Sequence, residues 1–273
     1  MKSTEEHLKK KAKKLRKEII TMSFRGRGSH ISSCLSIADI LTVLYFNTLK
    51  IHPKKHSHPK RDRFILSKGH AACALYVVLA HKGFFPKEYL ETYGCDGTLL
   101  GAHPEYGKIP GIELSTGSLG HGLSVGTGMA LAAKLDGSNH KVFVLLSDGE
   151  CNEGSVWEAA LFAGQNRLNN LVVIIDYNKL QAFGRVKNVI DLEPFYSKWE
   201  SFGWAVKEVD GHNHKELLKV INSIPLKKDR PTTIITHTIA GKGVSFLENK
   251  LEWHYLNLTE EQYRKAIEEL DNS

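Results

Sequence analysis

Two uninterrupted apolar runs constrain what this chain can fold into more than any other feature. Residues 142–146 read VFVLL and residues 171–175 read LVVII. Strands that are apolar at every position are typical of parallel sheets whose two faces are covered by helices. A helix is expected between the runs, at 157–167, and two more strands are expected at 204–209 and 232–238. The sequence therefore predicts an α/β fold, with a parallel sheet and helices on both faces.

Apolar residues at helical spacing predict further elements around this sheet. We expect a short strand at 64–67 and irregular segments at 47–62 and 91–118. Helices are expected at 5–24, 36–46, 71–81, 123–135, 214–221 and 259–270. The chain has 273 residues, 41% of them hydrophobic, and shows no internal repeat or low-complexity linker. We therefore expect residues 1–273 to form one domain with a full core, including a basic amino-terminal helix at about 5–24.

The positive charge of the chain is concentrated in two segments. The formal net charge is +7, and the excess of Lys and Arg lies within residues 2–17 and 52–63. Neither segment contains an aromatic residue on which a base could stack, so we expect solvated surfaces and no nucleic-acid partner. No stretch is apolar for long enough to span a membrane, and no signal peptide is recognisable. The four cysteines form no C-x-x-C pair, and together these features predict a cytoplasmic protein.

Polar residues follow both central runs at the point where each predicted strand ends. Asp148 and Asn178 are thirty residues apart, about one strand–helix–strand unit, so their oxygens are expected at the same carboxyl edge of the sheet. Carboxylate and amide oxygens suit Mg²⁺, with phosphate oxygens and water completing the shell. Gly149 leaves the backbone open to a phosphate, and the next helix begins there. The pattern predicts a metal that bridges the protein to a diphosphate; the alternative is two ordinary turn residues.

A glycine-rich loop and four histidines are further candidates. Residues 115–122 read STGSLGHG, which can lay backbone against a planar or anionic ligand, although an ordinary tight turn is the alternative. Its G-x-x-G-x-G order is not the dinucleotide fingerprint. His30, His70, His103 and His254 lie outside periodic apolar faces. Neutral imidazoles suit proton transfer near pH 7, whereas the alternative is four separate structural histidines.

These segments together resemble the transketolase family, and within it the separately encoded amino-terminal half. The resemblance extends from about residue 10 to residue 265. It rests on SHI at 29–31 with the following LS and ADIL, RDRFILSKGHA at 61–71, AHPE at 102–105, TGSLGHGLS at 116–124, SDGE at 147–150, DYNKLQ at 176–181, GKGVSF at 241–246 and Trp253-His254.

The chain departs from the family pattern at three positions. Ser147 stands where Gly is usual before Asp148, Ser29 stands where Gly is usual before the first histidine, and Ile31 stands where Pro is common. None of these changes removes a ligand. They leave room for a specialised substrate.

The resemblance implies a thiamine diphosphate-binding fold and a function. Thiamine diphosphate and Mg²⁺, with Ca²⁺ or Mn²⁺ as alternative metals, would support transfer of a two-carbon ketol unit from a ketose or ketose phosphate to an aldose. The implied metal ligands are Asp148, Asn178 and the main-chain carbonyl of Leu180. The implied cofactor contacts are His70, Gly117, Ser118, Leu119, Asp148, Gly149, Glu150, Asn178 and His254. The implied catalytic residues are His30, His70, His103 and His254, of which His30, His70 and His103 would lie near the reactive carbon and the hydroxyls of the donor.

The resemblance also implies a partner. In this family the glutamate that activates the cofactor, and the residues that hold the sugar phosphate, belong to a second, pyrimidine-binding domain. We therefore expect a separately encoded carboxyl-terminal transketolase subunit, an α₂β₂ assembly, and no activity of this chain alone. Glu153 and Glu158 would lie at the subunit interface, unless they are helix amino-terminal acids favoured by the dipole.

Two other functions compete with ketol transfer. One is transfer of an acyl (acetyl) unit from pyruvate within a specialised sugar-modifying enzyme. His103 favours a ketol donor, because such a donor offers it a hydroxyl that pyruvate lacks. The other is a non-catalytic assembly subunit, which the presence of both Asp148 and Asn178 disfavours.

Overall fold

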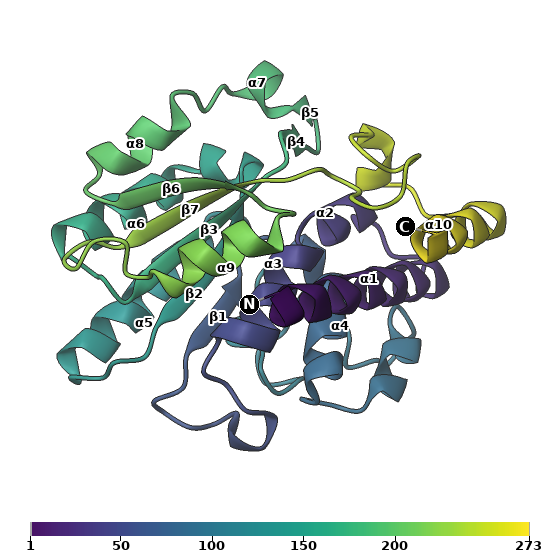
Figure 1. Cartoon of the computed structure of the whole chain (residues 1–273), viewed down its shortest axis with the longest axis horizontal. Coiled ribbons are helices and arrows are strands. Elements are labelled where there is room, and N and C mark those ends of the chain that lie inside the picture. Colours follow the sequence, from purple (N-terminus) through teal and green to yellow (C-terminus); the bar gives the residue numbers. More distant parts are fainter. Residues whose placement is uncertain (1, 273) are drawn as a thin grey trace.

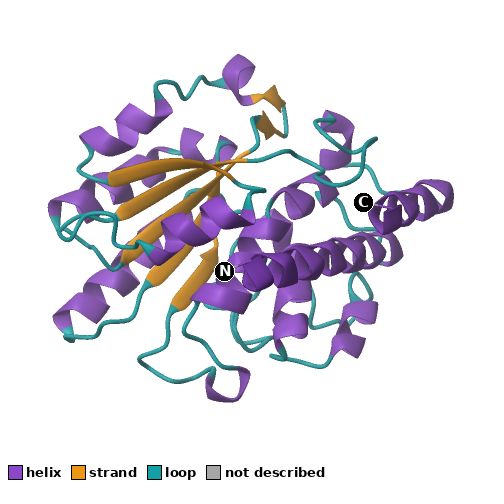
Figure 2. Ribbon diagram, viewed as in Figure 1, coloured by secondary structure: helices purple, strands orange, loops and turns teal. Residues whose placement is uncertain are grey.

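The computed structural model describes residues 2–272, so the predicted domain ends at residues 1 and 273 lie outside the described residues. Five strands form one sheet in the order β1-β2-β3-β7-β6 (Figures 1 and 2), and every neighbouring pair is parallel. This arrangement confirms the predicted α/β fold. The strands are β1 (Arg63–Leu66), β2 (Val142–Ser147), β3 (Leu171–Tyr177), β6 (Ala205–Asp210) and β7 (Thr232–His237).

Two apolar layers cover the two faces of the sheet, because successive residues of a strand point to opposite sides. In β2, Phe143 and Leu145 belong to one layer, and Val144 and Leu146 belong to the other. Figure 1 shows the helices on either side of the strands. The first layer includes α1 (Lys2–Arg25), α3 (Ala38–Val43), α4 (Ala72–Lys82), α9 (His214–Asn222) and α10 (Glu260–Asn272), and the second includes α5 (His121–Leu135), α6 (Gly154–Gln165) and α8 (Phe195–Ser201).

The helix expected at 36–46 is present from Ala38 onward, but a turn at Ile37 separates it from a preceding short helix, and its last turn is π-helical. The Ser36 hydroxyl donates to the Ser33 carbonyl and to the Asp176 carboxylate, and serine bonds of this kind compete with regular helix geometry. The three segments are α2 (Ile31–Ser36), α3 and a π-helical turn (Leu44–Thr48).

A small hairpin after β3 was not predicted. Its strands, β4 (Leu180–Gln181) and β5 (Gly184–Arg185), have two residues each, which is too short for an alternating pattern to show. The helices α7 (Val186–Val189) and α8 that follow were also missed. The Tyr255 hydroxyl donates to the Ala182 carbonyl over 3.1 Å, which ties the hairpin to the carboxyl-terminal part of the chain.

The remaining predicted helices and strands are present, with ends displaced by at most three residues. Short 3₁₀ segments occupy Pro53–Lys55, Gly69–Ala71, Lys87–Thr92, Gly149–Asn152 and Leu251–His254. Within residues 2–272, no helix combines the length and apolarity that a membrane span requires.

Candidate functional site

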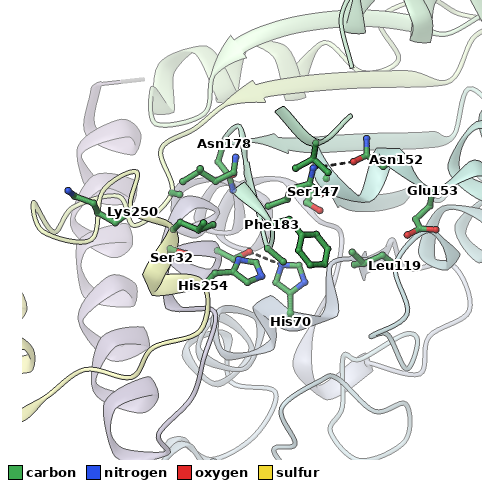
Figure 3. Close-up of a pocket in the computed structure, with 18 residues that line it drawn as sticks. Ser32, His70, Leu119, Ser147, Asn152, Glu153, Asn178, Phe183, Lys250 and His254 are labelled. Carbon is green, nitrogen blue, oxygen red and sulfur yellow. Dashed lines mark hydrogen bonds between the residues drawn. The ribbon is translucent and has the colours of Figure 1, made fainter. Parts of the chain in front are cut away.

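A cavity of about 320 Å³ lies at the carboxyl edge of the sheet (Figure 3). Its volume is within the range of about 300–1,000 Å³ that small-molecule sites occupy. The cavity is lined by polar residues from the strand ends, two histidines and the apolar tip of the β4–β5 hairpin, including Ser33, His70, Leu119, Ser147, Gly149, Asn152, Glu153, Asn178, Leu180, Phe183 and His254. A ligand site at this edge is what an open parallel sheet favours.

The predicted oxygen donors meet at the ends of β2 and β3. These strands are paired so that Ser147 lies beside Asp176, which brings the following Asp148 and Asn178 together. The buried Asp148 carboxylate accepts the N–H of Gly149 over 2.7 Å and the N–H of Lys179 over 2.6 Å. Burial and the neighbouring Asp176 raise the pKa of Asp148 to about 7. A bound cation stabilises the ionised form of such a carboxylate, because it offsets both the cost of burying the charge and the repulsion from the second carboxylate.

The donor set suits a hard metal ion whose remaining coordinating oxygens come from a bound molecule. No group of three or more His, Cys, Asp or Glu side chains in the described part of the chain could hold a metal ion alone. The other ligands at this edge must therefore be amide, main-chain or phosphate oxygens, a shell that suits Mg²⁺. Asn178 supplies an amide oxygen, which accepts the Leu180 N–H over 2.9 Å, and Leu180 itself lines the cavity.

Gly149 is required by packing as well as by the predicted approach of a phosphate. A Cβ atom at this position would lie 2.8 Å from the Cβ of Gln181, closer than real Cβ contacts allow. The amino terminus of α6 does not follow Asp148 directly, because a short 3₁₀ segment, Gly149–Asn152, lies between them. The Asn152 side-chain nitrogen is buried without a hydrogen-bond partner, while its oxygen accepts from Gln181.

Three of the four predicted histidines form one cluster. The ring centroid of His30 lies 5.1 Å from that of His70 and 4.8 Å from that of His254, and the centroids of His70 and His254 are 5.7 Å apart. Figure 3 shows His70 and His254 side by side at the cavity. Burial lowers the pKa of His30 to about 4, and the nearby His254, His103 and Lys68 contribute in the same direction. Burial and Lys68 lower the pKa of both His70 and His254, so all three rings are neutral at pH 7.

His30 is held in a strained backbone conformation. Its φ of +65° lies in the left-handed region, which residues other than glycine seldom adopt. The His30 N–H donates to the His254 carbonyl over 3.1 Å, and its Nδ1 lies 2.7 Å from the Ser29 hydroxyl. Strain of this kind persists where the surrounding structure fixes it, and it clusters at functional sites.

His103 stands apart from the other histidines. Its side chain is exposed, and its ring lies 3.3 Å from the position of a Cβ atom at Gly117. The hydroxyl of the buried Tyr76 donates to the main-chain carbonyl of His103 over 2.9 Å. Neither His103 nor His30 belongs to the cavity lining, so the predicted contacts of both with a substrate stay predictions.

The glycine-rich loop reaches the cavity through Leu119. Gly117 and Ser118 are exposed and do not line the cavity. Glu150 is fully buried, and its carboxylate accepts from the Ser67 hydroxyl and from the N–H groups of Gly120 and Ser147. Glu150 therefore fixes the loop against the sheet, and its predicted contact with a cofactor finds no support in the cavity lining.

The two predicted interface acids lie on or just before α6. Glu153 and Glu158 are both exposed, and Glu153 also lines the cavity (Figure 3). Their role at a subunit interface stays a prediction.

Sequence reasoning missed two residues that complete the site. Lys68 and Asp176 are fully buried and form an ion pair with 2.6 Å between Lys68 Nζ and Asp176 Oδ2. Both lie inside the sequence motifs described above, next to His70 and Asn178. The sequence did offer a signal for both residues, because each is charged and lies two positions before a predicted site residue.

Comparisons with known proteins agree with this geometry. The family model described as "Transketolase, thiamine diphosphate binding domain" matches residues 9–271. One subunit of an apulose-4-phosphate transketolase from Phocaeicola vulgatus is 43% identical over 265 residues, which cover 97% of this chain and 94% of that protein. One subunit of a 6-deoxy-6-sulfo-D-fructose transketolase from Clostridium sp. is 44% identical over 242 residues, which cover 89% of this chain and 88% of that protein.

The fold matches solved transketolases in the same way. The crystal structure of transketolase from Campylobacter jejuni superimposes with a TM-score of 0.90 at 32% identity and covers 97% of this chain. The match covers 42% of that transketolase, so this chain spans about two fifths of its length. The chain belongs to the transketolase family, whose thiamine diphosphate binding domain it carries, as the sequence motifs predicted.

Proposed function

We propose that this chain is the thiamine diphosphate-binding subunit of a split transketolase, which transfers a two-carbon ketol unit from a ketose or ketose phosphate to an aldose. One observation carries the proposal: Asn178 and Leu180, whose neighbour Lys179 donates its N–H to the buried Asp148, line one cavity together with the neutral His70 and His254. The family membership and the two relatives that are themselves transketolase subunits support the same activity. Residues 1–273 act in this proposal as one cofactor-binding domain, and a cytoplasmic location stays a prediction.

The strand ends provide the diphosphate end of the site. Asp148, Asn178 and the carbonyl of Leu180 would hold Mg²⁺, and Mn²⁺ or Ca²⁺ would suit the same oxygens. His70, His254 and the backbone of Gly149 would contact the diphosphate, while Leu119 would lie along the middle of the cofactor, all of them lining the cavity. When bound, thiamine diphosphate supplies the carbanion and electron-sink chemistry of the transfer.

The histidine cluster provides proton transfer. Because the three rings are neutral at pH 7, each can accept a proton from a donor hydroxyl. Nδ1 of His30 faces the Ser29 hydroxyl and Nε2 of His70 lies 3.0 Å from the Ser33 hydroxyl. Nε2 of His30 and Nδ1 of His70 are therefore the atoms that would exchange protons with the substrate.

Exposed apolar residues at the entrance of the cavity support a separately encoded partner. Phe183 is 84% exposed, and Val189 and Leu251 are 39% and 38% exposed, although all three line the cavity. We call these three residues the mouth patch. Apolar side chains gathered at one entrance indicate a surface that another protein covers. The carboxyl-terminal, pyrimidine-binding transketolase subunit would cover the mouth patch and enclose the cofactor.

A second exposed apolar region supports an α₂β₂ assembly. Leu161 and Phe162 on α6 are 57% and 48% exposed, and Val125 on α5 is exposed as well. Glu158 lies on the same helix about one turn before Leu161 and Phe162, and Glu153 immediately precedes that helix. Contact between two copies of the chain through α5 and α6 would pair the two sites of the assembly.

The identity of the donor substrate distinguishes ketol transfer from acyl transfer. The test uses the purified chain with its co-purified partner, thiamine diphosphate and Mg²⁺, and follows aldose extension with ketoses, ketose phosphates and pyruvate as separate donors. We expect turnover with a ketose or ketose phosphate and none with pyruvate. Turnover with pyruvate alone would replace ketol transfer by acyl transfer. The His103→Ala variant would then be assayed with the same donors. A loss of turnover confined to ketol donors would place His103 at their hydroxyls.

A further inference from the structure

The buried ion pair of Lys68 and Asp176 lies directly behind the metal end of the cavity. Both side chains are 0% exposed, and neither residue lines the cavity. A buried ion pair is costly to desolvate and is weak evidence for stability on its own. Its hydrogen bonds show which parts of the site it joins.

Asp176 accepts from four separate segments of the chain. Its Oδ2 accepts from Lys68 Nζ over 2.6 Å, from the Ser36 hydroxyl over 2.7 Å and from Asn178 Nδ2 over 2.9 Å. Its Oδ1 accepts from the Thr238 hydroxyl after β7. The carboxylate thus links α2, the segment after β1, the end of β3 and the end of β7.

The bond from Asn178 determines which way its amide points. Because Nδ2 donates to Asp176, the amide oxygen is directed to the other side, where it accepts the Leu180 N–H. That oxygen is the atom proposed to bind the metal. Without the acceptor on Asp176, the amide is free to turn and to present a nitrogen, which cannot coordinate a cation, in place of its oxygen.

Lys68 connects the same carboxylate to the histidine cluster. Its ammonium also donates to the Ser33 carbonyl over 3.1 Å, and the Ser33 hydroxyl lies 3.0 Å from Nε2 of His70. Lys68 balances the charge of Asp176, whereas the hydrogen bonds to Asp148 come from the backbone N–H groups of Gly149 and Lys179.

We propose that the Lys68–Asp176 pair is a positioning unit, which aims the Asn178 amide oxygen at the metal and fixes the His70 segment to the same strand end. The inference rests on the proposed function, since it requires a divalent metal at Asp148 and Asn178. Neither Lys68 nor Asp176 touches the metal. Groups that orient metal ligands in this way typically change metal affinity by about 10–100-fold when they are removed.

The test measures metal affinity in the full chain. Mn²⁺ is titrated in the presence of thiamine diphosphate, and free Mn²⁺ is followed by its electron paramagnetic resonance signal. For Asp176→Asn we expect the dissociation constant to rise at least about tenfold, because Lys68 is then left without its counter-charge beside the metal. Lys68→Met combined with Asp176→Leu removes both charges, and such apolar replacements of buried pairs usually fold. We expect the same loss of affinity, because Asn178 loses its acceptor.

Asp62→Asn is the matched control. Asp62 is 4% exposed and accepts the N–H groups of Lys50 over 2.8 Å and Lys141 over 2.9 Å, beside the amino-terminal end of β1. The Asp62→Asn variant therefore loses a buried carboxylate charge beside the same sheet, at a position away from the cavity. We expect a lower free energy of unfolding and an unchanged Mn²⁺ affinity.

The outcomes separate this inference from the proposed function. If the unmodified chain binds Mn²⁺ and the Asp176 variants bind it equally well, or if Asp62→Asn weakens binding as much, the positioning role is overturned. If Asp176→Asn does not fold, the double variant decides by the same criterion. If the unmodified chain binds no Mn²⁺, the proposed metal site fails. Because the positioning role requires that metal, it fails with the site in this case, whereas equal Mn²⁺ binding by the unmodified chain and the Asp176 variants overturns the positioning role alone.

Discussion

The floor and the entrance of the cavity are built in opposite ways. At the floor, Asp148 and Asp176 are 0% exposed and Asn178 is buried, and these three side chains are held by hydrogen bonds from several segments. At the entrance, Phe183 is 84% exposed and stands on a hairpin of two-residue strands. The difference supports the proposal that this chain supplies the metal and diphosphate end of the site and that another protein would complete the other side.

Removing the central ligand of the floor is expected to have the largest effect. Asp148→Ala takes away the one carboxylate proposed to touch the metal, so ketol transfer should fall below detection. Loss of groups outside the coordination shell already costs about 10–100-fold in metal affinity, and loss of a ligand costs more. Isothermal titration with thiamine diphosphate and Mg²⁺ measures the lost binding. Retained metal-dependent binding would place the metal elsewhere.

Much of the floor was predictable from the sequence, because it follows from two strand ends. The apolar runs predicted β2 and β3, and the spacing of Asp148 and Asn178 predicted their meeting. The division of α2 from α3 was not predictable, because it depends on a bond from Ser36 to Asp176, 140 residues away in the chain. Lys68 was missed for the same reason, since its partner is distant in sequence. The hairpin was missed because two residues show no periodicity.

Replacing a proposed catalytic histidine should have the second-largest effect on activity. His30→Asn keeps a residue that tolerates a positive φ, so the backbone can remain as it is. Since general acid–base groups contribute about 10²–10⁴-fold, we expect kcat to fall at least about 100-fold with cofactor binding retained. Steady-state kinetics with saturating cofactor measure this change. His56→Asn in the exposed loop is the matched control and should leave kcat unchanged; an equal loss in both variants would contradict a catalytic role for His30.

The entrance can be tested by weakening the mouth patch. Phe183→Ser removes its most exposed member, and loss of an aromatic contact at an interface typically costs about 1–2 kcal/mol or more. We expect the partner to bind about tenfold more weakly in a sedimentation or titration experiment. Leu135→Ser is the control, because Leu135 is 78% exposed at the far end of α5 and should not contact the partner. Equal weakening in both variants would mean that the loss is not specific to the entrance.

A further expected effect, on stability and not on activity, is a pH dependence that originates in the histidine cluster. The pKa of His30 is lowered from an ordinary 6.5 to about 4 in the folded chain, mainly by burial. Below pH 6.5 the unfolded chain therefore binds more protons, so the free energy of unfolding should fall as the pH drops from about 6.5 and level off near pH 4. Urea titrations across this range measure the slope. His30→Asn should flatten it, and an unchanged slope would show that His30 does not contribute.

Dependence on a second chain is the central claim, and reconstitution tests it most directly. The purified chain would be assayed for ketol transfer with thiamine diphosphate and Mg²⁺, first alone and then with increasing amounts of the carboxyl-terminal subunit that co-purifies with it. We predict no turnover by the chain alone, and activity that rises to a plateau at equal amounts of the two chains. Turnover by the chain alone, at a rate that the second chain does not change, would contradict the shared site.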